Sequence, residues 1–262
     1  MMTRPTVPLS YDVIDDDDDA TSNRLAGAAP WIALVALAAA TAAVAHGSVR
    51  DAFGAILRDP DHRWIYLASV LGGGGRGLGT VNLFVLLYLT SVIRLDEATT
   101  GLMYAALIVF SVPAPLVAGW LSDRFGRKPL IIAVYLGGAV GFALFMLVGP
   151  NLIGLWAGIV LMGIFTFAES PQLQALLADI APPTIRDASF ALYFTLAFGV
   201  GSLWTALYGV TIDAIGSGRG LVVVFWVMAA TFVAAALAVV RVRAGRRRPA
   251  GELKGAAEPP LL

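Results

Sequence analysis

Ten residues near the middle of the chain read Gly119-Trp120-Leu121-Ser122-Asp123-Arg124-Phe125-Gly126-Arg127-Lys128. This stretch is a charged turn between two long apolar runs. Gly126 permits a backbone turn with positive φ, and Gly119 permits the close approach of a second helix. Asp123 can cap the following helix or pair with Arg127, while the cations of the turn hold it at the inner face of a membrane.

The composition is typical of a polytopic membrane protein. Apolar residues make up 58% of the 262 residues and charged residues 14%, which is too little polar surface for a soluble domain. A helix needs about 20 mostly apolar residues to cross the hydrocarbon core. Seven segments meet this requirement: Ala28–His46, Trp64–Ile93, Thr100–Leu121, Pro129–Val148, Leu152–Ile180, Ser189–Ile212 and Leu221–Val242. The expected fold is therefore all-α and integral to the membrane, with about seven transmembrane helices.

The remaining segments differ in charge. Residues 1–24 include the acidic run Asp15–Asp19 and are expected to be disordered, as is the basic tail 244–262. Residues 25–47 are expected to form an extra transmembrane helix; a signal peptide is the alternative, but the acidic segment before it does not suit one. Residues 48–63 have apolar side chains at near-helical spacing, which predicts an amphipathic cytoplasmic linker. Residues 64–243 hold the last six spans.

The distribution of cations predicts the orientation. If the turn 119–128 is cytoplasmic and each span reverses direction, most arginines and lysines fall on the inner side. The outer side then holds only Arg4, Arg24, Arg94 and Arg219. Because positive charge concentrates in cytoplasmic loops, we expect a cytoplasmic C-terminus and an outer N-terminus.

Several classes of site are disfavoured by the sequence. The chain has no cysteine and two histidines, so disulfides and thiolate metal sites are excluded and no metal-ligand spacing is present. No nucleotide-binding loop is present, which disfavours an ATP-driven pump. We therefore predict no catalytic residues, no metal, no cofactor and no nucleic-acid partner.

Two charged residues lie deep inside predicted spans. Arg76 stands among six glycines in the eight residues 72–79, and Glu169 precedes Pro171. An intramembrane charge is costly, so it is a functional hypothesis by default. The glycines suggest close packing or a locally unwound helix, and Pro171 suggests a kink. From the helical rise, Arg76 lies ~18 Å and Glu169 ~15 Å from the cytoplasmic ends of antiparallel spans, at similar depth.

We hypothesise that Arg76 and Glu169 form a cavity-facing pair that binds a solute or alternates with a proton. The alternative is a structural ion pair that only holds the bundle together. Asn82 and Gln172 are weaker candidates for the same cavity, since a polar residue in a span often bonds only a neighbouring helix.

The turn matches every fixed position of G-x-L-x-D-R-x-G-R-[KR] and so resembles the signature loop of the major facilitator superfamily of secondary transporters. The resemblance implies twelve helices in two six-helix halves, with the last six spans of this chain forming one half. The strict form of the loop is typical of the family's N-terminal half, whereas the preceding span and amphipathic linker favour the C-terminal half. In the family, the first and fourth helices of each half line the central cavity, and Arg76 and Glu169 fall on those two helices.

The resemblance also implies a function. It predicts that the chain moves a small solute across the plasma (inner) membrane by alternating access, with possible proton coupling. The loop residues are then a gating latch: Gly119, Asp123, Arg124, Gly126, Arg127 and Lys128. Alternating access needs two bundles, so we expect a homodimer or a second half on another chain.

Two other functional classes are open to the sequence. One is a non-transporting remnant or accessory subunit that pairs with another membrane chain. The other is a seven-helix receptor, of which the retinal-binding kind is excluded because the two lysines, Lys128 and Lys254, lie outside the spans.

Overall fold

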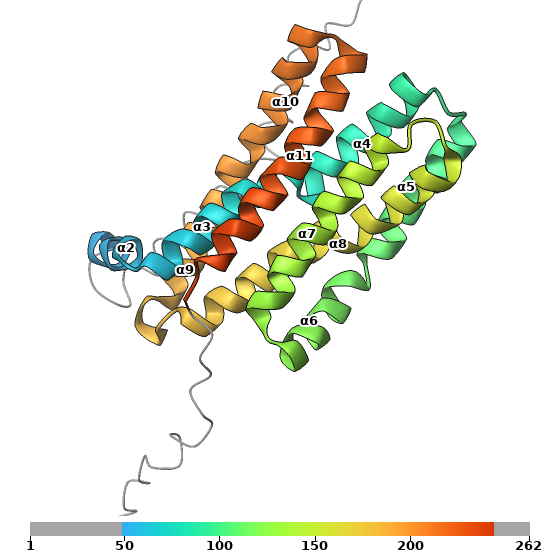
Figure 1. Cartoon of the computed structure of the whole chain (residues 1–262). Coiled ribbons are helices and arrows are strands. Elements are labelled where there is room, and N and C mark those ends of the chain that lie inside the picture. The colour runs from blue at the N-terminus through green and yellow to red at the C-terminus, as the bar shows by residue number, and fades with distance from the viewer. Residues whose placement is uncertain (1–48, 244–262) are drawn as a thin grey trace, which may run out of the picture. The chain divides into compact units, whose positions relative to one another are not determined.

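The computed structural model describes residues 49–243, all in helices and short connections (Figure 1). Six helical segments in this range are long and apolar enough to cross a membrane: Pro60–Ile93, Glu97–Phe125, Arg127–Leu147, Leu152–Ile180, Pro183–Ile215 and Ser217–Val240. They coincide with the last six predicted spans, most of them extended by a few residues. The predicted N-terminal segment 1–24, the extra span 25–47 and the tail 244–262 lie outside the described residues.

The predicted linker 48–63 divides into two elements. Helix α2 (Val49–Arg58) is amphipathic, with Ile56 buried against the bundle and Leu57 exposed. Helix α3 (Pro60–Gly72) already begins at Pro60, because Asp59 caps it by accepting a hydrogen bond from the Asp61 amide. The last residues assigned to the linker therefore belong to the first span of the bundle.

The first span is interrupted at its centre. After α3 come a 3₁₀ turn η1 (Gly73–Gly75), an extended residue Arg76 (φ −65°, ψ 134°) and a π-helical turn η2 (Gly77–Val81). Helix α4 (Asn82–Tyr88) and a second π-helical turn η3 (Leu89–Ile93) complete the span. The glycine run predicts close packing or local unwinding, and the structure has both.

The second span bends at proline. Helix α5 (Glu97–Ser111) starts at Asp96, whose side chain accepts from the Thr99 amide at 2.9 Å. It stops before Pro113, and α6 (Ala114–Phe125) follows. Gly126 then turns the chain into α7 (Arg127–Leu147) with the predicted positive φ, 96°.

The last three spans complete the bundle. Helix α8 (Leu152–Ile180) continues through Pro171. The fifth span contains η4 (Pro183–Ile185), α9 (Arg186–Phe194), the π-helical turn η5 (Thr195–Val200) and α10 (Gly201–Ile215). Helix α11 (Ser217–Val240) is the sixth.

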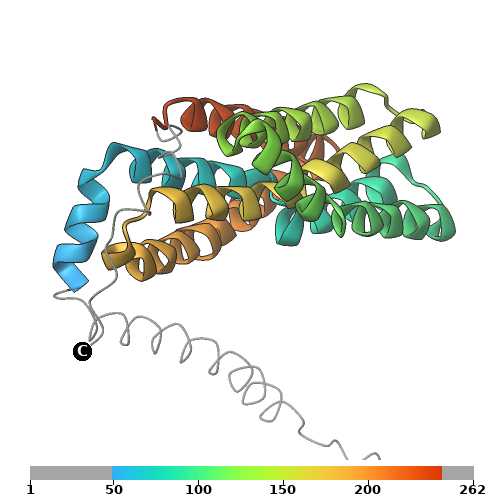
Figure 2. The same cartoon turned by 90° about the horizontal axis from the view of Figure 1, so that it is seen from below.

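The core of the bundle lies between α7 and its neighbours. Helix α7 packs along α8 and α11, and α11 also packs on α3, as Figures 1 and 2 show. Phe232 of α11 makes edge-to-face contacts with Tyr135 and Phe142 of α7, and all three are fully buried.

Two faces of the bundle are apolar and are not covered by any other part of residues 49–243. One is formed by α5 and α6, where Val112 and Leu116 are 68% and 75% exposed. The other is formed by α10, where Leu203 and Val210 are 62% and 66% exposed. Contiguous apolar surface of this kind needs lipid or a protein partner.

Candidate functional site

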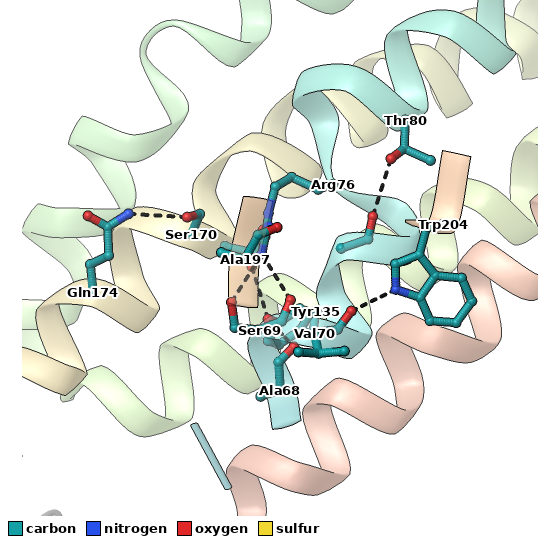
Figure 3. A network of polar contacts seen from close by, with 12 residues as sticks. Ala68, Ser69, Val70, Arg76, Thr80, Tyr135, Ser170, Gln174, Ala197 and Trp204 are labelled. Atoms are coloured by element: carbon teal, nitrogen blue, oxygen red, sulfur yellow. Dashed lines mark hydrogen bonds and ion pairs between the residues drawn. The ribbon is translucent and has the colours of Figure 1, made fainter. Parts of the chain in front are cut away.

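Arg76 lies at the break in the first span, and its side chain turns into the bundle (Figure 3). Only 8% of the side chain is exposed. Its Nε donates to Glu169 Oε1 at 2.5 Å, Nη1 donates to the Ala197 carbonyl at 2.8 Å, and Nη2 donates to the Ser69 carbonyl at 3.0 Å. One guanidinium therefore joins the broken first span, α8 and the π-helical turn η5.

Glu169 is completely buried on α8 and has a second partner. The Tyr135 hydroxyl donates to Glu169 Oε2 at 2.9 Å and also lies 3.1 Å from the Ala68 carbonyl. A hydroxyl carries a single proton, so Tyr135 can donate to only one of these two acceptors at a time. With the carboxylate ionised, the charge-assisted bond to Glu169 is the stronger of the two.

Side chains from α10 and from the first span itself satisfy the carbonyls near the break. Trp204 Nε1 donates to the Val70 carbonyl at 2.8 Å, and the Tyr208 hydroxyl donates to the Gly74 carbonyl at 2.9 Å. The Thr80 hydroxyl donates to the Gly73 carbonyl at 3.3 Å (Figure 3). Irregular backbone at membrane depth is tolerated only where the freed polar groups find such partners.

The glycines let other helices reach this irregular backbone. A Cβ at Gly72 would stand 2.6 Å from the Tyr135 hydroxyl oxygen, and one at Gly75 would stand 2.6 Å from a Phe232 ring carbon. Neither distance is possible without movement of the ring. The run of glycine is therefore required by packing around Arg76.

Asn82 and Gln172 are not bonded to the pair in the described structure. The side-chain oxygens Asn82 Oδ1 and Gln172 Oε1 are buried and have no hydrogen-bond partner within residues 49–243. An unsatisfied buried oxygen costs about 1–3 kcal/mol. Both amides thus retain an acceptor that a donor group could use.

Sequence reasoning missed three partners of the pair. Tyr135 could have been suspected because it lies mid-span, whereas span tyrosines are usually enriched at the interfaces. Ser69 and Ala197 contribute carbonyl oxygens, for which the side-chain pattern holds no signal. No group of three or more His, Asp or Glu side chains within residues 49–243 could hold a metal ion.

The turn 119–128 contacts the ends of two other helices. Lys128 Nζ donates to the carbonyls of Val240 and Val242 at 2.7 and 2.5 Å, at the C-terminus of α11. Arg127 Nε donates to Asp179 near the end of α8 at 2.5 Å, and Arg127 lies 3.9 Å from Asp123.

Two other residues of the turn behave differently. The guanidinium of Arg124 lies 5.8 Å from the ring centre of Trp120. No described helix makes the close approach that Gly119 permits, because an added Cβ would meet no heavy atom of the described residues within 4 Å. Its half-exposed position on α6 leaves open space where a packed helix was expected.

The six long apolar helices, packed around a buried ion pair, define an integral membrane protein. Residues 65–261 match the sequence model of the Major Facilitator Superfamily, which is most of the chain. The chain therefore belongs to this family.

Curated relatives are matched over part of their length. The chain is 32% identical over 141 residues to the class C tetracycline resistance protein of Escherichia coli, covering 53% of this chain and 35% of that protein. It is 29% identical over 120 residues to a Na(+), Li(+), K(+)/H(+) antiporter of Planococcus maritimus, covering 42% and 28%. The chain thus spans about a third of the length of these two relatives.

A solved structure shows the same fold. The POT family transporter PepTSo superposes with a TM-score of 0.58 and 14% identity, covering 69% of this chain and 36% of PepTSo. The bundle therefore corresponds to a part of a larger facilitator fold.

Proposed function

We propose that this chain supplies one six-helix half of a secondary transporter that moves a small solute by alternating access. The observation that carries the proposal is the Arg76–Glu169 pair, buried at a break in the first span of a facilitator-type bundle. Breaking a buried pair by removing one partner costs about 3–5 kcal/mol, so the pair resists change until a ligand or a proton compensates it. We assign it the role of solute and coupling site.

The site requires a second bundle. Alternating access rocks two bundles about a central site, and one bundle cannot enclose that site. The exposed apolar faces of α5–α6 and α10 support such a partner, which we propose to be a second copy of the chain or a separate half. The unpartnered oxygens of Asn82 and Gln172 are proposed as further solute contacts.

The turn 119–128 is proposed as a cytoplasmic latch. Arg127 and Lys128 bind the ends of α8 and α11, so displacing them would free both helix ends to move. We propose a cytoplasmic C-terminus and a location in the plasma membrane; the concentration of arginine on that side of the bundle supports the orientation.

Native mass spectrometry of gently extracted protein tests the assembly. We expect a two-chain particle, or a one-to-one complex with a second membrane chain. A stable single-chain particle that carries no solute after reconstitution would contradict the proposal and favour a non-transporting accessory subunit.

Uptake into proteoliposomes tests the site. With a panel of small radiolabelled solutes at an imposed pH gradient, we expect uptake of at least one of them. Arg76→Gln should abolish that uptake, whereas the matched Arg219→Gln, at an exposed arginine at the start of α11, should preserve it. Equal uptake by both variants would remove Arg76 from the site.

A further inference from the structure

The charge balance at Arg76 constrains what can bind there. Its acceptors are the Glu169 carboxylate and the neutral carbonyls of Ala197 and Ser69, with a longer contact to the Ser69 hydroxyl. Among the ion pairs of residues 49–243, Glu169 is the single anionic partner of Arg76. The observed site is therefore neutral, and it is neutral only while Glu169 is ionised.

If Glu169 is protonated, the Tyr135 hydroxyl oxygen can accept a hydrogen bond from it. Tyr135 Oη lies 2.9 Å from Glu169 Oε2 and 3.1 Å from the Ala68 carbonyl. When Glu169 is protonated, its hydroxyl can donate to Tyr135 Oη while the Tyr135 hydroxyl turns to Ala68. The site can thus hold the added proton with every hydrogen bond satisfied.

The lost negative charge, by contrast, has no replacement in the site. The titratable groups that face Glu169 are Arg76, Tyr135 of α7 and, by charge interaction, Tyr193 of α9. Both tyrosines are neutral at physiological pH. Protonation of Glu169 would leave the Arg76 cation buried without a counter-charge, which the protein interior strongly disfavours.

We propose, building on the transport role above, that the solute is a small monovalent anion, of the carboxylate class, that loads together with one proton. The proton passes from water to Glu169, and the anion replaces the Glu169 carboxylate as the counter-charge of Arg76. The site thus changes from Arg⁺ and Glu⁻ to Arg⁺, anion⁻ and protonated Glu, and its net charge stays zero. Glu169 accepts from Arg76 through Nε alone, and the carboxylate of a small solute can accept charge-assisted hydrogen bonds from the same guanidinium.

Solutes of other classes would leave the buried site with a net charge or leave Arg76 without a counter-charge. A cationic solute would be repelled by the positive charge of the Arg76 guanidinium. An anion without the proton would place two negative charges against one positive charge in a buried site. A neutral solute has no group to replace the carboxylate on Arg76.

Proton uptake during equilibrium binding tests the inference on the purified full-length protein. Benzoate is the probe, and benzamide is its neutral counterpart of the same shape. In weakly buffered solution with a pH indicator, we expect benzoate to take up about one proton per molecule bound, with Kd rising about tenfold per pH unit where Glu169 is ionised. Benzamide should not bind. Benzoate binding without proton uptake, equal binding of benzamide, or no benzoate binding at millimolar concentration would each overturn the inference.

Variants separate the two charges. Glu169→Gln imitates the protonated form and should bind benzoate without proton uptake and without dependence on pH. If this variant does not fold because Arg76 is unpaired, the neutral pair Arg76→Gln with Glu169→Gln restores charge balance and should bind no benzoate. Benzoate binding by the double variant at wild-type affinity would place the anion elsewhere.

These binding experiments do not require transport. Binding with proton uptake but no reconstituted flux would sink the transport role and leave the ion site intact. Flux of a neutral solute, independent of pH, would support the transport role and contradict the proposed binding of an anion with a proton.

Discussion

Tyr135 donates its hydroxyl to a carboxylate in the bundle interior, and its loss should be measurable. Tyr135→Phe leaves Glu169 with one donor fewer. A hydrogen bond to a charged group contributes about 1.5–3 kcal/mol, so the unfolding temperature in detergent should fall. The matched control is Tyr104→Phe, because Tyr104 makes no hydrogen bond through its hydroxyl within the described residues. Equal unfolding temperatures for the two variants would show that the Tyr135 bond contributes nothing.

Gly75 tests the packing around the break. Its added Cβ would stand 2.6 Å and 2.8 Å from the Phe232 and Phe142 rings. Overpacking of this kind costs about 1–3 kcal/mol, so Gly75→Ala should lower thermal stability. Gly101→Ala is the control, since Gly101 lies in α5 with open space around it; there alanine should be neutral or stabilise by about 0.5–1 kcal/mol. A Gly75→Ala protein as stable as the wild type would contradict the close approach.

Arg76 and Glu169 were identifiable from the sequence because a charge inside an apolar span is rare. Their similar depth followed from the constant rise of a helix. Tyr135 was not identifiable with the same certainty, since a tyrosine can be satisfied by any nearby acceptor. The Ala197 carbonyl could not be found at all, because every residue has one.

The C-terminus of α11 is capped by a residue from another helix. The last carbonyls of a helix have no partner inside it, and Lys128 donates to two carbonyls there. Lys128→Met should therefore raise the rate of hydrogen–deuterium exchange over the last turn of α11. The free energy of local opening there should fall by about 0.3–1 kcal/mol. Arg124→Met is the control, because the Arg124 guanidinium lies near the Trp120 and Phe125 rings of its own helix. Equal exchange in both variants would argue against the cap.

The first span shows how far an element can be predicted. The glycine run indicated a weak point, since glycine costs roughly 1 kcal/mol per residue in a helix interior. The local sequence does not reveal that Trp204 and Tyr208 of α10 satisfy the freed carbonyls. The same holds for α2, whose end at Arg58 depends on the cap that Asp59 provides for α3.

The membrane orientation can be tested on the natural chain, which has no cysteine. Single cysteines at Arg94 and Arg219 should react with a membrane-impermeant maleimide in intact cells. Cysteines at Arg124 and Arg186 should react only after permeabilisation. All four side chains are exposed, so access to the reagent depends on the side of the membrane. The reverse labelling pattern would invert the bundle and move the turn 119–128 to the outside.

The six described spans, the positive φ of Gly126 and the presence of two intramembrane charges followed from residues close together in the chain. Hydropathy, glycine content and helical rise are local quantities, so neighbouring residues determine them. The contacts of the site were decided only by packing: Arg76 and Glu169 are 93 residues apart, and Lys128 and Val240 are 112 apart. Which acceptor a buried donor reaches depends on how the helices lie side by side. That arrangement results from the summed burial of the whole bundle, which no short stretch of sequence contains.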